Sequence, residues 1–329
     1  GFYRSTDQGE SWERMSDYNT SGQYYGEFFA HPTDINTLYS METVSKVTYD
    51  AGKTWTALGL EERHVDDHAF WIDPTDTQHF MIGGDGGIYE SFDHGKHFIF
   101  KSNLPVTQFY RVSVDNEYPF YNVYGGTQDN NSFGGPSQSL FSDGVMNHDW
   151  ITTLGGDGFW QAIDPENPDI VYSEYQYGNL FRFDRKSGER IAIKPLPRAG
   201  EDTYKWQWDT PFILSTHNSK RLYMVANKVF RSDDRGDSWQ VISEDISQNL
   251  SRDKWPVMDR YWSVDGVAKN VSTSQFGLGV SLCESPVKEN LIYVGTDDGV
   301  VQVSENAGIS WSKISKFEGV PEYTYVSDL

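Results

Sequence analysis

The sequence predicts an all-β protein, a seven-bladed β-propeller of four-stranded blades, and three observations lead to this fold class. The 329 residues include 11 Trp, 20 Tyr and 19 Phe beside 30 Gly and 13 Pro, a mixture typical of many short strands joined by tight turns. A box motif, Ser-x-Asp-x-Gly-x-Ser/Thr-Trp, recurs along the chain. A second set of polar turns, two of them Asp-Pro, starts at intervals of 42, 42, 49, 51 and 70 residues, and a unit of roughly 40 to 50 residues is the length of a propeller blade.

The box motif is predicted to form the turn between the third and fourth strands of each blade. Its Asp can accept backbone N–H bonds across the turn, its Gly takes the positive φ, and its aromatic residue packs between neighbouring sheets. We therefore expect a structural role for the central residues of the copies, which are Asp7, Asp50, Asp93, Asp184 in a worn copy, Asp234 and Asn306. The fourth repeat has lost its box, around residues 134–143.

The polar turns and the boxes together define the expected domain organisation. Six whole blades are expected over about residues 20–319, and a seventh blade is split between residues 1–15, its last two strands, and residues 320–329, its first strand. The second strand of that blade has no counterpart in the sequence, and a propeller closes its ring to remove sheet edges. We therefore expect residues 1–329 to form a single propeller domain, a fragment of a larger protein that supplies the closing strand.

The composition excludes several classes of partner and cofactor. A formal net charge of −21 at pH 7 would repel the phosphates of nucleic acid and an anionic membrane surface. The chain contains no apolar stretch of roughly 18 residues, so we expect no membrane insertion. It also lacks a Gly-rich phosphate loop, a Cys pair for zinc and a nucleophile elbow, so we expect no cofactor. Cations, neutral polymers such as glycans, and basic peptides remain as ligands.

The working surface is predicted on the face opposite the box turns. In a blade the box turn and the turn between strands 1 and 2 share one face, while the turn between strands 2 and 3 and the passage to the next blade share the other. The two longest departures from the repeat, residues 196–208 and 243–274, both follow a fourth strand and therefore fall on the second face. Functional sites are expected where insertions collect.

Acidic residues recur on that second face at matching positions. Glu42, Asp85 and Asp298 each stand eight residues before the central residue of their box, and we assign Asp129 to the same tier. Asp66 and Asp157 each stand seven residues before an Asp-Pro turn. One interpretation is that Asp-Gly makes a good hairpin turn. The other is a ring of carboxylates around the central channel, which would raise individual pKa values as general acids need, or bind a cation.

Histidines and aromatic residues accompany these carboxylates. His64, Asp66 and His68 alternate, so an extended backbone would point all three the same way and zinc ligation is one interpretation. A third His or Cys at useful spacing is missing, so we expect solvated loop histidines and no metal site. The aromatic residues near this face either pack between blades or stack on sugar rings. They are Trp160, Tyr175, Tyr177, Trp206 and Trp208.

The boxes, together with the turns at residues 83–89, 125–130 and 155–160, resemble those of the sortilin-type, Asp-box (BNR) repeat propellers of bacteria. Such proteins are often labelled glycosyl hydrolases because they are similar to the two-propeller xyloglucanases. The resemblance covers the whole chain. It implies a secreted protein in an extracellular, cell-surface or periplasmic location.

The same resemblance implies a catalytic position. In the xyloglucanases one catalytic Asp lies in a Thr-Asp-x-Gly-Gly-type turn after the second strand of a blade, and here Asp85 matches that turn best and Asp298 second. The other carboxylate of that family comes from a second propeller, which this sequence does not contain. Sialidases share the boxes but need an arginine triad and an Arg-Ile-Pro segment, which we do not find.

Three functional hypotheses follow. The first is a secreted, sortilin-like propeller that binds a glycan or peptide on the face opposite the boxes, with the remaining part of its own polypeptide as a partner. The second is an endo-acting glycoside hydrolase of the xyloglucanase type that needs a second propeller to cleave O-glycosyl bonds. The third is a structural module of a surface assembly.

Overall fold

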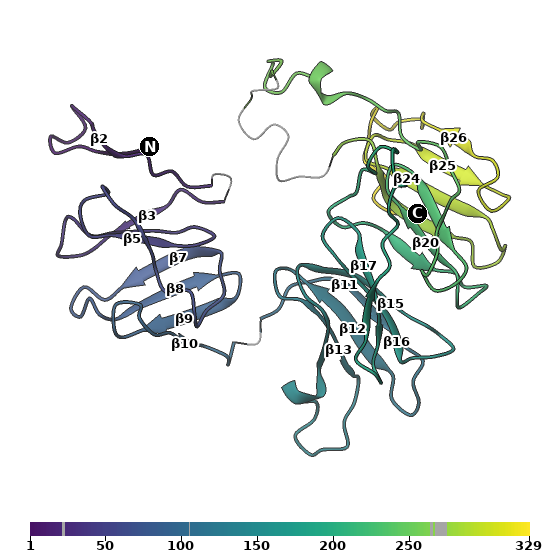
Figure 1. The fold of residues 1–329 in the computed structure, drawn as a ribbon, viewed down its shortest axis with the longest axis horizontal. Helices are drawn as coiled ribbons and strands as arrows, with labels where there is room; N and C mark the ends of the chain where they lie inside the picture. The colour runs from purple at the N-terminus through teal and green to yellow at the C-terminus, as the bar shows by residue number, and fades with distance from the viewer. Residues whose placement is uncertain (22–23, 105, 264–265, 267–274) are drawn as a thin grey trace. The chain divides into compact units, whose positions relative to one another are not determined.

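The computed structural model describes residues 1–21, 24–104, 106–263, 266 and 275–329. Over these residues the strands form six four-stranded antiparallel sheets and one two-stranded sheet, with two short 3-10 turns (Figure 1). These seven sheets confirm the predicted all-β, seven-bladed propeller class. The strands divide between two compact units, residues 1–107 (unit 1) and 108–329 (unit 2). No helix in the described part of the chain has the length and apolar composition to cross a membrane.

Unit 1 contains the two-stranded sheet and two four-stranded sheets, each an antiparallel meander in chain order. The two-stranded sheet pairs β1 (Phe2–Arg4) with β2 (Glu13–Ser16). The four-stranded sheets are β3 (Phe28–Ala30), β4 (Leu38–Ser40), β5 (Lys46–Thr48) and β6 (Thr56–Ala57), then β7 (Asp67–Ile72), β8 (Phe80–Gly84), β9 (Gly87–Ser91) and β10 (Ile99–Phe100). One core joins them, with Tyr39, Met41, Val47, Leu58, Phe70, Phe80 and Ile82 buried in it.

Unit 2 contains four four-stranded meanders (Figure 1). The first two are β11 (Phe109–Val114), β12 (Asn122–Thr127), β13 (Ser132–Pro136) and β14 (Ile151–Leu154), then β15 (Gly158–Ile163), β16 (Ile170–Tyr175), β17 (Asn179–Asp184) and β18 (Arg190–Ala192). The last two are β19 (Phe212–Leu214), β20 (Leu222–Val225), β21 (Val229–Ser232) and β22 (Gln240–Val241), then β23 (Gly279–Glu284), β24 (Ile292–Thr296), β25 (Val301–Ser304) and β26 (Ser312–Ile314). The short turns η1 (Asn147–Asp149) and η2 (Arg252–Lys254) lie in connections.

Strand β20 explains how consecutive sheets pack. All four of its residues are buried. Leu222 and Met224 contribute to one core cluster, whereas Tyr223 and Val225 contribute to the next. Successive side chains of a strand point to opposite faces, so a strand between two neighbouring sheets is apolar on both. This is why β20 is a continuous apolar run without alternation.

The box turns are built by the side chains that the motif specifies. In the copy around Asp234, the Ser232 hydroxyl donates to Asp234 at 2.7 Å, and the backbone N–H of Ser238 donates to the same carboxylate at 2.9 Å. Arg235 and Gly236 follow with φ of 62° and 88°. The Ser11, Thr54, His97 and Ser310 backbone N–H groups make the corresponding bonds to Asp7, Asp50, Asp93 and Asn306. In the worn copy, Asp184 accepts from the N–H groups of Lys186 and Ser187.

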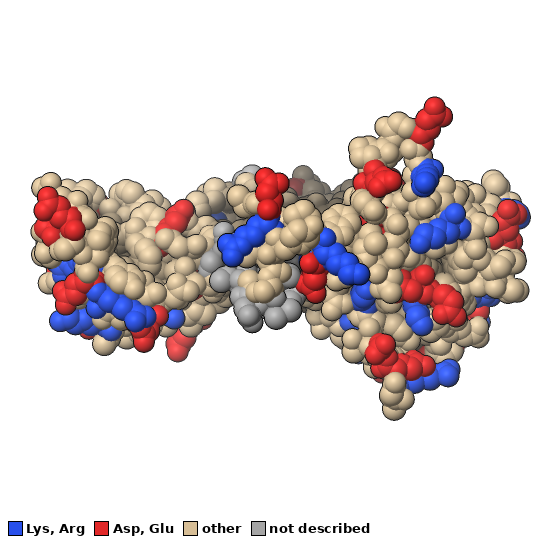
Figure 2. Space-filling view, turned by 90° about the horizontal axis from the view of Figure 1, so that it is seen from above, with Lys and Arg blue, Asp and Glu red and all other residues tan. Residues whose placement is uncertain are grey.

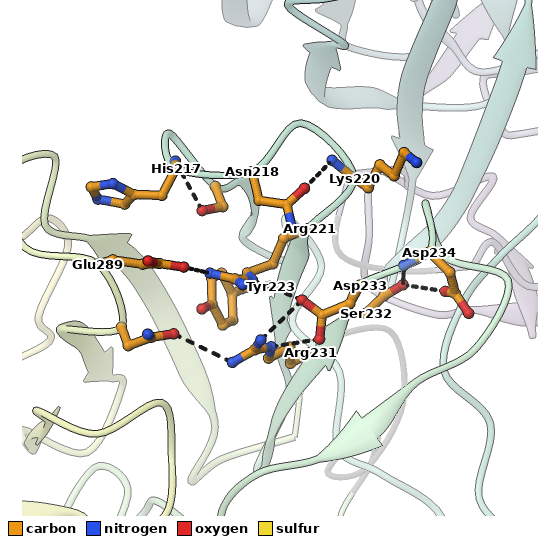
Figure 3. Close-up of polar contacts among 12 residues, drawn as sticks. His217, Asn218, Lys220, Arg221, Tyr223, Arg231, Ser232, Asp233, Asp234 and Glu289 are labelled. Atoms are coloured by element: carbon orange, nitrogen blue, oxygen red, sulfur yellow. Dashed lines mark hydrogen bonds and ion pairs between the residues drawn. The ribbon is translucent and has the colours of Figure 1, made fainter.

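Polar contacts place two kinds of turn on one face of unit 2. Arg235, in the box turn of one blade, donates to Asp164, in the strand 1–2 turn of the preceding blade, at 2.9 and 2.8 Å. Next to it, Arg221 donates to Asp233 at 2.8 Å and to Glu289 at 2.7 Å, and Glu289 lies in the strand 1–2 turn of the following blade (Figure 3). The box turns and the strand 1–2 turns therefore share a face, as predicted.

The two parts of the predicted split blade differ from each other. Residues 2–4 and 13–16 form strands, in line with the expected third and fourth strands. Residues 320–329, predicted to supply the first strand, contain no strand in the structure. Val326 of this segment instead lies against β23 and β24: its N–H donates to the Thr296 carbonyl at 3.1 Å, and its carbonyl accepts from the Ser281 hydroxyl at 2.7 Å.

Candidate binding site

Two predicted acidic residues meet on the second face of unit 2. Asp129 lies in the turn between β12 and β13, and Asp157 lies in the passage from β14 to β15. The Asp129 N–H donates to the Asp157 carboxyl at 2.7 Å, and the two side chains are hydrogen-bonded to each other. The side-chain amide of Gln176, in the turn between β16 and β17, also donates to Asp157. Turns from two neighbouring blades thus converge on one buried carboxyl group.

The environment of Asp157 favours its protonated form. Burial raises the pKa of this carboxyl to about 6, and the nearby charge and carboxyl group of Asp129 raise it further, whereas the hydrogen bonds from the Asp129 N–H and from Gln176 oppose the shift. The group is only 6% exposed. The pKa of Asp157 therefore lies about two units above that of an ordinary aspartate.

Aromatic rings adjoin the carboxyl pair. The ring of Tyr110, on β11, lies 4.6 Å from that of Phe159, which lies 6.2 Å from that of Trp208. Trp208 ends the predicted insertion 196–208, and its ring is perpendicular to that of Tyr177 at 5.1 Å. Burial and the charges of Asp157 and Asp129 raise the pKa of Tyr110 to about 12, so this phenol stays a hydrogen-bond donor. We call Tyr110, Asp129, Asp157, Gln176 and Trp208 the binding face.

The ion pair of Arg111 and Asp209 lies next to Trp208, at the border of the binding face. The Arg111 guanidinium donates to Asp209 at 3.1 Å and lies 4.5 Å from the centre of the Trp160 ring. Gln207, within the insertion 196–208, donates to the Tyr325 hydroxyl at 3.2 Å. Burial raises the pKa of Asp209, while Arg111 opposes that rise. Arg111 on β11 thus contacts β15 through Trp160 and the segment that leads into β19 through Asp209.

Glu174 on β16 is a buried carboxyl group that the sequence analysis missed. Its side chain is fully buried, and that burial, with the charge of Asp209, raises its pKa well above the ordinary value. Burial also lowers the pKa of Lys194, whose ammonium group donates to the Tyr177 carbonyl at 2.8 Å. A glutamate in the middle of an apolar second strand gives no sequence signal that separates it from a solvated one.

Several non-glycine residues at these turns have left-handed backbone conformations. Asp129, Asn131 and Tyr177 have φ of 61°, 74° and 63°, and Asp66 in unit 1 has a φ of 67°. Such conformations cost about 1 kcal/mol or more each and tend to persist at binding and active sites, where surrounding contacts hold them. The box turns contain left-handed residues as well, Arg235 among them, so this conformation reflects tight turns on both faces.

Unit 1 holds three of the predicted carboxylates, Glu42, Asp66 and Asp85. Asp85, between β8 and β9, lies 3.1 Å from His68 Nε2, and both side chains are partly exposed. The His68 ring stacks on Tyr25 at 5.4 Å, and the Tyr25 hydroxyl donates to Asp66. Glu42 is buried, with its carboxylate accepting from the N–H and hydroxyl of Ser21 at 2.9 and 2.5 Å. Asp85 is the more accessible of the two predicted catalytic residues.

Asp298 occupies the corresponding turn of unit 2, but its carboxylate faces inward. It is fully buried and accepts from the Thr296 hydroxyl and from the Gln248 N–H, both at 2.6 Å. The adjacent Asp297 was missed by the sequence analysis. Burial raises its pKa to about 6, although it accepts from the N–H groups of Gly277 and Leu278 at 3.0 and 2.9 Å. The spacing to the box motif predicted the position of this turn correctly. It did not show which of its two carboxylates, Asp297 or Asp298, has the raised pKa.

The predicted aromatic residues divide into two kinds. Trp206 stacks on Phe230 at 5.5 Å within a core cluster, and Tyr175 stacks on Phe181 at 5.9 Å. Trp160 packs beneath Arg111, and Trp208 packs against Phe159 and Tyr177. All of these side chains are half-buried. Among the described residues, no group of three or more His, Cys, Asp or Glu side chains is arranged to hold a metal ion.

A match to a protein family model supports the predicted box repeat. A family model described as BNR/Asp-box repeat matches residues 3–14, which contain the first box. The chain therefore carries the BNR-type repeat that the sequence predicted. No curated protein sequence matches the chain.

Solved structures of similar arrangement include two enzymes and one peptide complex. A GH74 xyloglucanase from Xanthomonas campestris shares 16% identity at a TM-score of 0.38, over 93% of this chain and 49% of that chain. A GH74 enzyme from Niastella koreensis shares 15% identity at a TM-score of 0.31, over 89% and 50%. YCF48 bound to D1 peptide shares 13% identity at a TM-score of 0.36, over 91% and 85%. This chain spans about half the length of the two GH74 enzymes.

Proposed function

We propose that this chain is a secreted β-propeller module that binds a neutral glycan at the binding face of unit 2. The observation that carries the proposal is the hydrogen-bonded pair of Asp129 and Asp157, which receives the Gln176 amide and adjoins the rings of Tyr110 and Trp208. Ligand sites in proteins combine apolar or aromatic walls with a few convergent polar groups. The binding face has this composition.

The chemistry of the pair suits hydroxyl groups. The Asp157 carboxyl, whose pKa burial raises, offers acceptor oxygens to a sugar hydroxyl, and the Gln176 amide adds a donor. An aromatic ring such as Trp208 offers an apolar surface to the C–H face of a sugar.

The charge of the chain supports an uncharged ligand. The net charge is −21, and acidic and basic side chains are interspersed in the view of Figure 2. Such a surface gives no long-range attraction for an anionic polymer. A basic peptide is the alternative to a neutral glycan as the ligand of an acidic protein.

The test is the affinity of the full chain for xyloglucan and neutral β-glucan oligosaccharides, measured by isothermal titration calorimetry. Trp208→Ala and Gln176→Ala should each weaken binding about tenfold, or ~1.4 kcal/mol. Asp143→Asn removes an exposed carboxylate from the opposite face, so it should bind as the wild type does. Binding that is equal in all four proteins, or binding of a lysine-rich peptide in place of every glycan, would contradict the proposal. If neither ligand binds, the structural-module hypothesis is favoured.

A glycoside hydrolase remains the second candidate function because Asp85 is partly exposed beside His68. The Asp129–Asp157 pair does not suit that chemistry, since glycosidase carboxyl groups stand about 5 Å apart in retaining enzymes and 6.5–9.5 Å apart in inverting ones. Asp85 would need a second carboxylate from another part of the polypeptide.

The enzyme candidate is tested by release of reducing ends from xyloglucan and β-glucans by the full-length protein. Asp85→Ala should abolish activity if Asp85 is catalytic, whereas Asp143→Asn should leave it unchanged. Equal activity in wild type and Asp85→Ala, or none in either, removes Asp85 from the catalytic residues.

A further inference from the structure

The insertion between β22 and β23 contains an exposed apolar segment. Every residue from 251 to 262 is exposed. Five of these residues have large apolar side chains, with exposures of 91% for Met258, 66% for Tyr261, 59% for Val257, 41% for Trp262 and 36% for Trp255. Single exposed apolar residues are common on soluble proteins, but a contiguous group of this kind marks an interaction surface.

The segment has a defined shape. Val257 and Arg260 exchange backbone hydrogen bonds of 2.9 and 3.2 Å across a two-residue turn. The turn residues Met258 and Asp259 have φ of 53° and 58°, the left-handed conformations of a tight hairpin. The indole N–H of Trp262 donates to the Val257 carbonyl at 3.1 Å. Met258 therefore stands at the apex of a closed hairpin, with Tyr261 and Trp262 on its second arm.

The base of the hairpin is attached to unit 2 through aromatic contacts. The Trp255 ring lies 5.6 Å from Phe276 and 4.9 Å from Tyr323. The Arg252 guanidinium lies 5.7 Å from the centre of the Phe276 ring. A preformed surface of this kind loses little conformational entropy when it binds.

The hairpin also differs from the chain in charge. Residues 251–262 contain Arg252, Lys254 and Arg260 against Asp253 and Asp259, in a protein of net charge −21. The Arg260 guanidinium lies 4.5 Å from the centre of the Trp262 ring. Trp, Tyr and Arg are the residues most enriched at the energetic centres of protein interfaces.

We propose that residues 251–262 are a docking hairpin for a protein partner whose surface presents carboxylates around an apolar pocket. The apolar apex and the Tyr261 and Trp262 side chains fill the pocket, while Arg252 and Arg260 meet the carboxylates. A protein fits better than a membrane, because Asp253 and Asp259 interrupt the apolar residues, and a localised set of carboxylates can pair with Arg252 and Arg260 while these two aspartates stay in solvent. This surface lies outside the binding face and does not depend on the glycan proposal.

The test selects short random peptides, displayed on ribosomes, on the full chain. The enriched peptides should combine Asp or Glu with large apolar residues. They should bind the triple variant Met258→Ser, Tyr261→Ser, Trp262→Ser at least about tenfold more weakly than wild type. Arg252→Gln with Arg260→Gln should weaken binding and reduce its dependence on salt concentration.

The matched control is Leu140→Ser with Phe141→Ser, which removes two apolar side chains exposed by 92% and 63% from the loop between β13 and β14. It should bind the peptides as wild type does, and all variants should melt at the wild-type temperature. Failure to enrich peptides, enrichment of basic peptides, or equal binding to the triple variant would overturn the proposal. Hairpin-dependent binding to phosphatidylcholine–phosphatidylglycerol vesicles, or self-association lost in the triple variant, would replace the proposed partner with a membrane or a second copy.

Discussion

Single carboxyl groups of this protein respond to pH in opposite directions. The box residues Asp7 and Asp50 accept several hydrogen bonds, which lower their pKa to about 2, whereas burial raises the pKa of Asp157 and Asp297 to about 6. The box carboxylates contribute stability above the unfolded pKa of Asp, and that stability is lost as the pH falls through about 2. Asp157 and Asp297, whose pKa values are raised, have the opposite effect: the folded state loses stability as the pH rises and these groups ionise.

Replacing Asp157 with Asn should remove part of this pH dependence. The wild-type group is protonated in both folded and unfolded chains below about pH 4, so its effect on the free energy of unfolding appears as the pH rises to about 6 and reaches roughly 3 kcal/mol at most. Asn can still accept from the Asp129 N–H. Thermal unfolding should therefore give Asp157→Asn a melting temperature several degrees above wild type at pH 8 and close to it at pH 4. A melting temperature that stays below wild type at pH 8 would contradict this assignment.

Glu174 and Glu284 are both buried, yet the same substitution should affect them differently. Glu174 has a pKa held well above its usual range by burial, so Glu174→Gln keeps a neutral group and should change the stability at pH 7 by less than about 1 kcal/mol. Glu284 accepts from the Tyr223 hydroxyl at 3.2 Å and the Asn290 N–H at 3.1 Å, with Arg221 at 4.0 Å. Glu284→Gln should cost about 1–3 kcal/mol in urea unfolding at pH 7, because it removes the charge that faces Arg221. Equal losses in both variants would show that Glu174 is ionised.

At the scale of the element, the hydrogen bonds of the box turns could be predicted from the sequence. The packing partners of loop side chains could not. The box motif fixes its own hydrogen bonds, because donor, acceptor and Gly all lie within one short segment. The roles of Trp206 and Trp208 differ although both end the same insertion, since one fills a core and the other borders a turn. Gln176 and Arg111 were missed because a turn amide and a strand arginine have no characteristic spacing. Their roles depend on contacts between sheets.

The box turn should tolerate Asn better than Ala. Asp234→Ala removes the acceptor of the Ser238 N–H and of the Ser232 and Ser238 hydroxyls, and should cost about 1–2 kcal/mol in urea unfolding. Asp234→Asn should lose less than half of that, because Asn306 accepts the equivalent Ser310 N–H at 2.9 Å in its own turn. An Asn variant as unstable as the Ala variant would mean that the charge, not the hydrogen bond, holds the turn.

At the scale of the whole molecule, the fold class followed from internal repetition, because each repeat encodes one sheet that cannot bury its faces alone. The candidate site was predicted less completely. Matching positions identified Asp129 and Asp157 separately, but only the packing of adjacent sheets brings them into contact. The expected strand at residues 320–329 has the composition of a strand, and in the structure this segment lies against β23 and β24 through Val326.

The net charge should also act on the molecule as a whole. A charge of −21 destabilises a compact chain through self-repulsion, and salt screens that repulsion. Raising NaCl from low to moderate ionic strength at pH 7 should therefore raise the melting temperature by a few degrees, as differential scanning calorimetry can measure. A melting temperature that falls with salt would indicate that attractive surface ion pairs such as Lys288–Glu305 outweigh the repulsion.

The two-faced burial of β20 restricts how this protein can change over evolutionary time. Exchange of one apolar residue for another within such a strand disturbs a single interface. Loss or gain of one residue there would move Leu222 and Met224 into the place of Tyr223 and Val225, and would damage the contacts with both neighbouring sheets at once. Changes of length should therefore accumulate between strands, where the chain already has its docking hairpin and the loop that ends in Trp208.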